Sequence, residues 1–126
     1  MNSLLVLAAF LAVAIGLAHS WLGEQYIIVR LFRRSDLPKM FGSDEFTRQT
    51  IRFAWHLTTI AWWGFAAVLM VLSGSIAGIN VDRGLLLAIA FTFLASAALA
   101  LVLTRGRHLS WVVFLAIAAI CILVAF

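Results

Sequence analysis

The chain has 126 residues, of which 65% are hydrophobic and 11% are charged, and its mean hydropathy is +1.12. Soluble domains are about half apolar and about a quarter charged, so this composition excludes an ordinary soluble fold and predicts an integral membrane protein. The formal net charge is +4, but the basic residues flank apolar segments and form no continuous patch. Such flanking charges are typical of loops that face the cytoplasm and anionic lipid head groups, and nucleic acid is not expected as a partner. Cys121 is the only cysteine, which excludes a disulfide within the chain and any paired-cysteine motif.

Four apolar segments follow one another, and each is close to the roughly 20 helical residues that a hydrocarbon layer requires. The sequence therefore predicts an all-α fold: a four-helix bundle in the membrane, running up, down, up and down, as a single domain over residues 1–126. The expected helices cover about residues 3–32, 44–72, 84–104 and 108–126. No Lys or Arg precedes the first segment, so we expect it to be retained as a helix and not cleaved as a signal peptide.

The connections between these segments are short and polar. Residues 33 to 45 contain Pro38, the only proline, and are expected to form a loop. We expect Ser43 to cap the second helix, with the carboxylates of Asp44 and Glu45 beside its positive end. The glycine-rich stretch 73–84 ends the second helix, and residues 104–108 permit only a tight helical hairpin.

The basic residues predict the orientation of the chain in the membrane. Eight of them lie in or beside the first and third connections, whereas only Arg83 lies in the second. The eight are Arg30, Arg33, Arg34, Lys39, Arg48, Arg52, Arg105 and Arg107. Cytoplasmic loops carry the excess of Lys and Arg, so both termini are expected on the non-cytoplasmic side, in the inner membrane if the source is bacterial.

The three histidines are the main candidates for function. With helices of alternating direction, His19, His56 and His108 all fall in the cytoplasmic half of the membrane, and Glu24 is expected at a similar level. Imidazole and carboxylate groups suit transition metals such as Zn, Fe or Cu, so these four residues are the predicted metal ligands. Haem b is the alternative cofactor, held by two axial histidines. No HExxH or similar spacing occurs, so each ligand would come from a different helix.

The surroundings of His56 and His19 add detail to this prediction. Arg48, Arg52, His56, Thr59 and Trp63 share one stripe of the second helix, and such a stripe must be buried against other helices. We expect His56 to point into the bundle with His19 opposite it. Gly16 and Gly23 are expected to mark the closest approach to the first helix. Ser20, Tyr26 and Thr59 are the expected neighbours that orient the ligands.

Three functions therefore stay open. The first is a metal- or haem-binding membrane protein, with redox activity among the expectations. The second is a small transporter or channel coupled to protons or metal ions, although no carboxylate lies in the middle of a span. The third is a lipid-binding or partner-binding subunit, as a homo-oligomer or within a membrane complex. In that case Arg48 and Arg52 bind a lipid phosphate, or pair with Glu24. The sequence predicts no catalytic residue.

Overall fold

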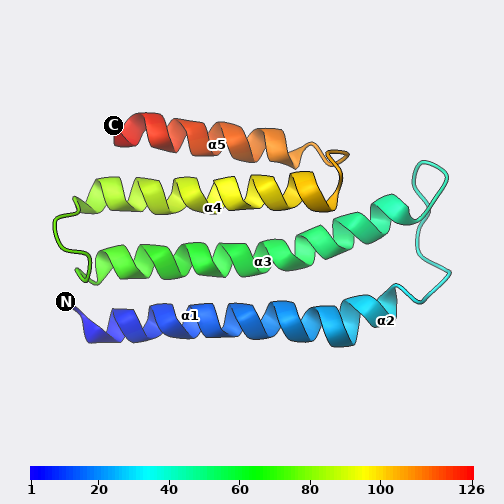
Figure 1. The fold of residues 1–126 in the computed structure, drawn as a ribbon, viewed down its shortest axis with the longest axis horizontal. Helices are drawn as coiled ribbons and strands as arrows, with labels where there is room; N and C mark the ends of the chain where they lie inside the picture. The colour runs from blue at the N-terminus through cyan, green and yellow to red at the C-terminus, as the bar shows by residue number, and fades with distance from the viewer.

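The structure, a computed structural model, describes all residues 1–126 and contains helices as its only regular elements. The first helical segment comprises α1 (Ser3–Leu22), the π-helix η1 (Gly23–Ile28) and the short α2 (Val29–Leu31). It is followed by α3 (Glu45–Leu72), α4 (Val81–Leu103) and α5 (Ser110–Ala125). Successive segments run in opposite directions (Figure 1), so the predicted all-α class and the up-and-down order are confirmed.

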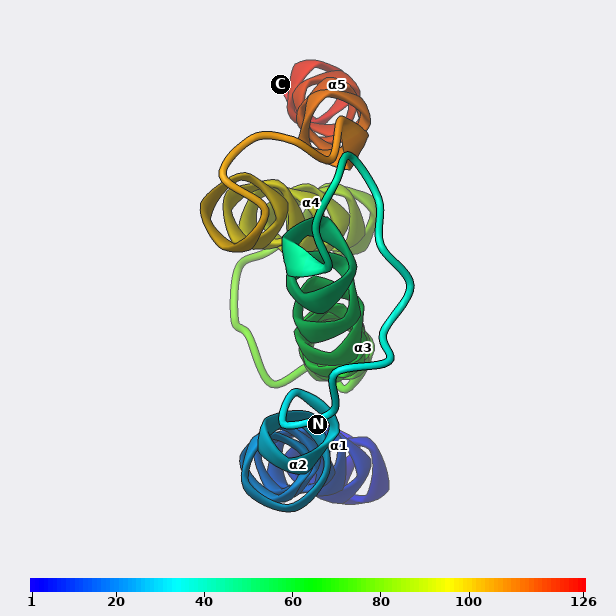
Figure 2. The same ribbon diagram turned by 90° about the vertical axis from the view of Figure 1, so that its right-hand side faces the viewer.

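The helices lie side by side in a single row and do not close into a bundle. α1 contacts α3, α3 contacts α4, and α4 contacts α5, while no contact joins α1 to α4 or to α5. Figure 2, which looks along the helices, shows this row. The expected closed bundle is therefore wrong, and the four helices share no common core. Small residues line the contacts, among them Ala9, Gly16, Ala88 and Ala97, whereas most large apolar side chains are exposed. Such exposure costs little in hydrocarbon, where close approach of backbones holds helices together.

Three of the helical segments are long and apolar enough to cross a membrane: Ser3–Leu31, Glu45–Leu72 and Val81–Leu103. The fourth, α5, is apolar but has only 16 residues. At 1.5 Å per residue it extends about 24 Å, less than the roughly 30 Å of a hydrocarbon core.

The starts of α3 and α4 differ from the predicted ones. The N-cap of α3 is Asp44 and not Ser43, and its carboxylate pairs with Arg48 at 2.6 Å instead of capping the helix. The hydrogen bond from Arg48 lowers the pKa of the Asp44 carboxyl. α4 begins three residues earlier than predicted because the side chain of Asn80 accepts a hydrogen bond from the Arg83 N–H at 3.1 Å.

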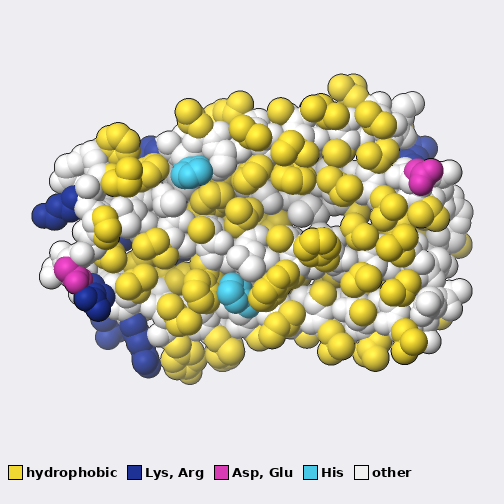
Figure 3. All heavy atoms as spheres, turned by 180° about the vertical axis from the view of Figure 1, so that it is seen from behind, with side chains coloured by type: hydrophobic (Ala, Val, Ile, Leu, Met, Phe, Trp, Pro, Cys, Tyr) yellow, Lys and Arg dark blue, Asp and Glu magenta, His cyan; other side chains and the backbone are white.

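Most of the cations gather at one end of the row. We call the end formed by α2, the start of α3 and the 104–109 connection the basic end; Figure 3 shows the concentration of Lys and Arg there. Both termini lie at the opposite end (Figure 1). There the Asn2 N–H donates to the Ser73 carbonyl at 2.7 Å, and Arg83 lies over the Phe126 ring at 3.9 Å.

This arrangement makes the orientation in the membrane testable with two reporter fusions, one at each end of the row. We expect the basic end to face the cytoplasm, because Lys and Arg are retained on that side. In bacterial cells, a reporter that is active only outside the cytoplasm should be active after Phe126 and inactive when inserted after Asp36. The reverse pattern would contradict the predicted orientation.

Candidate functional site: the polar interface of α1 and α3

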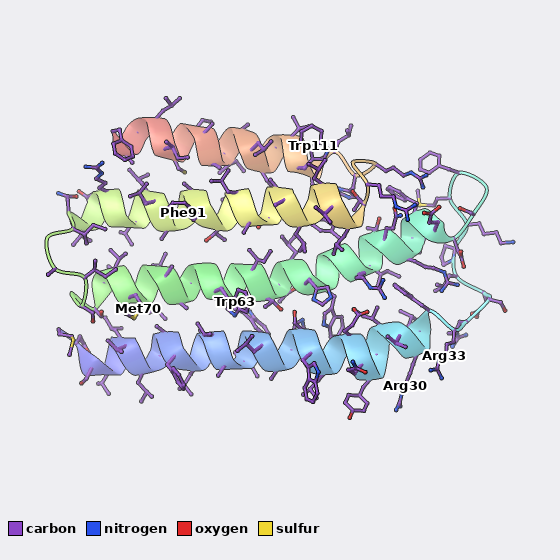
Figure 4. The ribbon with its side chains drawn as sticks, in the orientation of Figure 1. Arg30, Arg33, Trp63, Met70, Phe91 and Trp111 are labelled. Atoms are coloured by element: carbon purple, nitrogen blue, oxygen red, sulfur yellow. The ribbon has the colours of Figure 1, made fainter.

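Two glycines of α1 and η1 let α3 approach closely, as predicted. A Cβ atom on Gly23 would lie 2.1 Å from Nε1 of Trp55, and one on Gly16 would lie 2.6 Å from Nε1 of Trp63. Real Cβ atoms do not come this close to other heavy atoms, so each indole occupies the space that only a glycine leaves. Figure 4 shows Trp63 in the contact between α3 and α1.

Both indoles also donate hydrogen bonds to backbone carbonyls of α1. Trp55 donates to His19 at 3.2 Å, and Trp63 donates to Val13 at 3.3 Å. His19 lies in the last turn of α1, and η1 follows from Gly23, where the backbone changes from α- to π-helical spacing. Single-turn π-helices are rare and occur frequently at functional sites.

A chain of polar side chains crosses this interface. Glu24 of η1 pairs with Arg52 at 2.7 Å and with Nε2 of His56 at 3.2 Å. The other ring nitrogen of His56, Nδ1, lies 2.8 Å from the Ser20 hydroxyl, which lies 2.8 Å from the Thr59 hydroxyl. Thr59 in turn donates to the carbonyl of Gly16 at 3.4 Å. We call this set the α1–α3 polar chain; it comprises Arg52, Glu24, His56, Ser20, Thr59 and the Gly16 carbonyl.

Exposure falls along the α1–α3 polar chain from the basic end inward. The side chains of Arg52, Glu24 and His56 are 39%, 30% and 22% exposed, and Thr59 is only 3% exposed. Beyond Gly16, α1 carries no polar side chain until Ser3. The α1–α3 polar chain is therefore accessible to solvent at the basic end and ends near the middle of the helices.

The geometry allows the polar chain two hydrogen-bond directions. When His56 is neutral and Nε2–H donates to the Glu24 carboxylate, Nδ1 accepts from Ser20, which accepts from Thr59. When His56 is doubly protonated, Nδ1–H donates to Ser20, Ser20 donates to Thr59, and Thr59 donates to Gly16. Each hydroxyl has a single proton to donate, so protonation of one imidazole reverses both hydroxyls.

His56 points into the α1–α3 interface as predicted, but His19 is not its partner. The ring of His19 stacks on Trp55 with centroids 4.6 Å apart and meets Trp62 edge-on at 4.9 Å. Its Nε2 atom is buried without a hydrogen-bond partner. His19 therefore packs between tryptophans while Ser20, the next residue, holds His56.

His108 lies on the other side of α3. Its Nδ1 atom is 2.9 Å from the Ser110 hydroxyl, and its ring contacts Phe46 and Phe53. No group of three or more His, Cys, Asp or Glu side chains lies close enough to hold a metal ion. The predicted ligand set of His19, His56, His108 and Glu24 is thus not assembled within the chain. His108 is kept away by the open row, because the 104–109 connection joins α4 and α5 and neither of these helices contacts α1. His19 is kept away from His56 by the rotation of α1, which turns Ser20 toward His56 instead.

Two predicted anion-binding residues are already occupied. Arg52 pairs with Glu24, one of the two partners expected for it. Arg48 pairs with Asp44 and also donates to the carbonyls of Phe32 and Arg34, which follow the last turn of α2. Arg48 thus donates hydrogen bonds to carbonyls that follow α2, where carbonyls lack partners within the helix.

Of the neighbours expected to orient the ligands, Ser20 and Thr59 are in the polar chain and Tyr26 is not. Tyr26 is 55% exposed and its ring contacts the guanidinium of Arg30. Trp63 was predicted on the buried stripe, but the hydrogen bonds that Trp55 and Trp63 donate to α1 were not predicted. These contacts have a signal in the sequence. Two glycines, Gly16 and Gly23, are seven residues apart on one helix, and two tryptophans, Trp55 and Trp63, are eight residues apart on the next.

Comparisons of the chain with protein-family models, curated proteins and solved structures find no match.

Proposed function

We propose that the chain is an integral membrane protein that binds and releases a proton at the Glu24–His56 pair, and so belongs to the proton-coupled class among the expected functions. The observation that supports it is that both ring nitrogens of His56 are engaged, one by a carboxylate and the other by the hydroxyls of Ser20 and Thr59. Imidazole exchanges protons at physiological pH, and ionisable groups within transmembrane segments generally serve a function.

In this proposal the proton enters and leaves from the basic end. A proton from water binds Nδ1 of neutral His56, the imidazolium is stabilised by the Glu24 carboxylate, and the Ser20 and Thr59 hydroxyls turn toward Gly16. Release returns the proton by the same route, because no polar side chain continues the path past Gly16 on α1. The proton thus changes the hydrogen bonds that join α1 to α3, which is a means of coupling pH to the pairing of these helices.

The histidine-lined metal or haem site is the second candidate. Its support is the pair of ligand-type atoms, Oε2 of Glu24 and Nε2 of His56, at 3.2 Å. A transition metal needs further ligands, for which this chain places no third His, Cys, Asp or Glu beside the pair. Proton binding accounts for the hydrogen bonds at both ring nitrogens of His56 and is preferred for that reason.

Nuclear magnetic resonance of histidine-labelled protein in lipid vesicles tests the proposal, because the chain has only three histidines. We expect the His56 ring to change from singly to doubly protonated as the pH is lowered. Glu24→Gln should change the chemical shift of Nε2 of His56, because it replaces the carboxylate 3.2 Å from that nitrogen by a neutral amide. The ring signals of His108, which bonds Ser110 and contacts no carboxylate, should be the same in Glu24→Gln and are the internal control.

Two results would overturn the proposal. One is a His56 ring that keeps a single proton over the whole pH range in which the protein stays folded. The other is a stoichiometric metal, or a haem absorption band, in the purified protein that is lost in His56→Ala; this result would support the second candidate instead.

A further inference from the structure

An apolar groove follows the contact between α1 and α3, on the side where His19 stacks on Trp55. Its volume is about 370 Å³, and its walls include Ile15, His19, Leu22, Tyr26, Trp55 and Trp62. From Ile15 to Ile27 the groove extends about 18 Å at 1.5 Å per residue. One leaflet of a bilayer contributes about 15 Å of hydrocarbon, half of the roughly 30 Å core. The groove therefore has the length of one acyl chain.

Two cations lie at the end of the groove nearest the basic end. Tyr26 lines the groove, and the guanidinium of Arg30 lies over its ring at 5.5 Å from the centroid. Arg33 is exposed one turn further on, and Figure 4 shows Arg30 and Arg33 pointing away from α3 on the outer side of α2. Arg30 belongs to α2, and Arg33 lies in the turn that follows it, where its N–H donates to the Arg30 carbonyl at 3.2 Å.

These two arginines are free, in contrast to the other arginines at the basic end. Arg34, Arg48, Arg52, Arg105 and Arg107 each form an ion pair with a carboxylate. Arg30 and Arg33 have no carboxylate partner, and the carboxylates at this end, Glu24, Asp36, Asp44 and Glu45, are all engaged. An anion for Arg30 and Arg33 must therefore come from outside the chain.

We infer that Arg30 and Arg33 bind the phosphate of an anionic phospholipid, one acyl chain of which lies in the groove beside Trp55 and Trp62. Guanidinium groups bind phosphate through parallel N–H donors. Exposed aromatic side chains such as Trp21 and Tyr26 are typical of the head-group level of a membrane. The lipid-phosphate site thus involves Arg30 and Arg33 in place of the predicted Arg48 and Arg52, which are already paired.

The site can be tested with lipids that carry bromine on their acyl chains, which quench nearby tryptophans. Brominated phosphatidylglycerol is titrated into the detergent-solubilised full chain, and brominated phosphatidylcholine into a second sample. We expect phosphatidylglycerol to quench Trp55 and Trp62 at much lower mole fractions. Each arginine near an anionic surface contributes on the order of fivefold in affinity, so Arg30→Gln/Arg33→Gln should weaken this binding about thirtyfold.

Arg105→Gln/Arg107→Gln is the matched control, because it removes the same charge from the same end but from arginines that are paired with Glu45. It should leave the affinity for phosphatidylglycerol within about twofold, since both arginines contact Glu45 and neither lines the groove. Equal weakening by both double variants would show attraction to bulk charge alone and would overturn the site.

Ala18→Phe tests the groove separately, because Ala18 lies in its wall and a phenyl ring would fill it. We expect this variant to keep its helical circular dichroism and lose the quenching by bound phosphatidylglycerol. Full quenching in folded Ala18→Phe would overturn the position of the acyl chain. Neither result depends on protonation of His56, so this inference and the proposed function can fail independently.

Discussion

Gly23→Ala is expected to destabilise the protein by about 3 kcal/mol, although alanine normally favours a helix over glycine. The backbone at Gly23 is ordinary right-handed helix, with φ −63° and ψ −44°, so an alanine fits it without strain. Its Cβ atom, however, would lie 2.1 to 2.5 Å from three atoms of the Trp55 indole. The indole cannot move without breaking its stack on His19 and its hydrogen bond to the His19 carbonyl.

A double variant identifies Trp55 as the cause. In a Trp55→Leu background the space over residue 23 is open, so Gly23→Ala should become neutral or stabilise the protein by up to about 1 kcal/mol through helix propensity. The free energy of unfolding in mixed micelles, followed by circular dichroism, measures all four proteins. Destabilisation by Gly23→Ala in both backgrounds would contradict the close contact of Trp55 with Gly23.

Glu24→Ala is expected to cost about 2 kcal/mol, between the values for exposed and buried ion pairs, because Glu24 and Arg52 are about one-third exposed. The variant leaves the Arg52 guanidinium without an anion, and its Nε atom is already buried without a partner. It also removes the acceptor for Nε2 of His56. Arg52→Ala should lower the free energy of unfolding by a similar amount. The double variant should lower it by clearly less than the sum, since each single variant leaves the other charged side chain without its partner.

Glu45→Ala provides the comparison for this cycle. Glu45 also pairs with two arginines, Arg105 and Arg107, but all three side chains are more than 40% exposed. Its loss should change the free energy of unfolding by less than about 1 kcal/mol. Equal effects of Glu24→Ala and Glu45→Ala would mean that the Glu24–Arg52 pair is as well solvated as a surface pair.

The helical elements followed from local sequence and were predictable. Long apolar runs must satisfy their backbone hydrogen bonds internally, and charged or glycine-containing stretches end them. The π-helix at Gly23–Ile28 was not predictable, because its register depends on how Trp55 of α3 meets Gly23 and the His19 carbonyl. The closed bundle was also a wrong expectation, since apolar side chains that face lipid and those that face a helix look alike in sequence.

The candidate site was predicted in its composition but not in its pairing. A polar stripe with Arg52, His56 and Thr59 on one helix had to find partners, and Glu24 was among the partners expected. The stripe did not reveal which residue of α1 would meet His56, because His19 and Ser20 are adjacent in sequence and differ by about 100° around the helix. The rotation of α1 against α3 places His19 among tryptophans and Ser20 in the polar chain.

The sequence by itself determined four apolar helices, the separation of basic residues to one end, and the presence of a polar stripe that required burial. These properties depend on the order of residues within single segments. Only the tertiary structure decided that the helices form a row, that His56 meets Glu24 and Ser20, and that Arg30 and Arg33 are left without partners. Those outcomes depend on the rotation and depth of one helix against another, which are set by contacts such as Trp55 on Gly23 between residues distant in the chain.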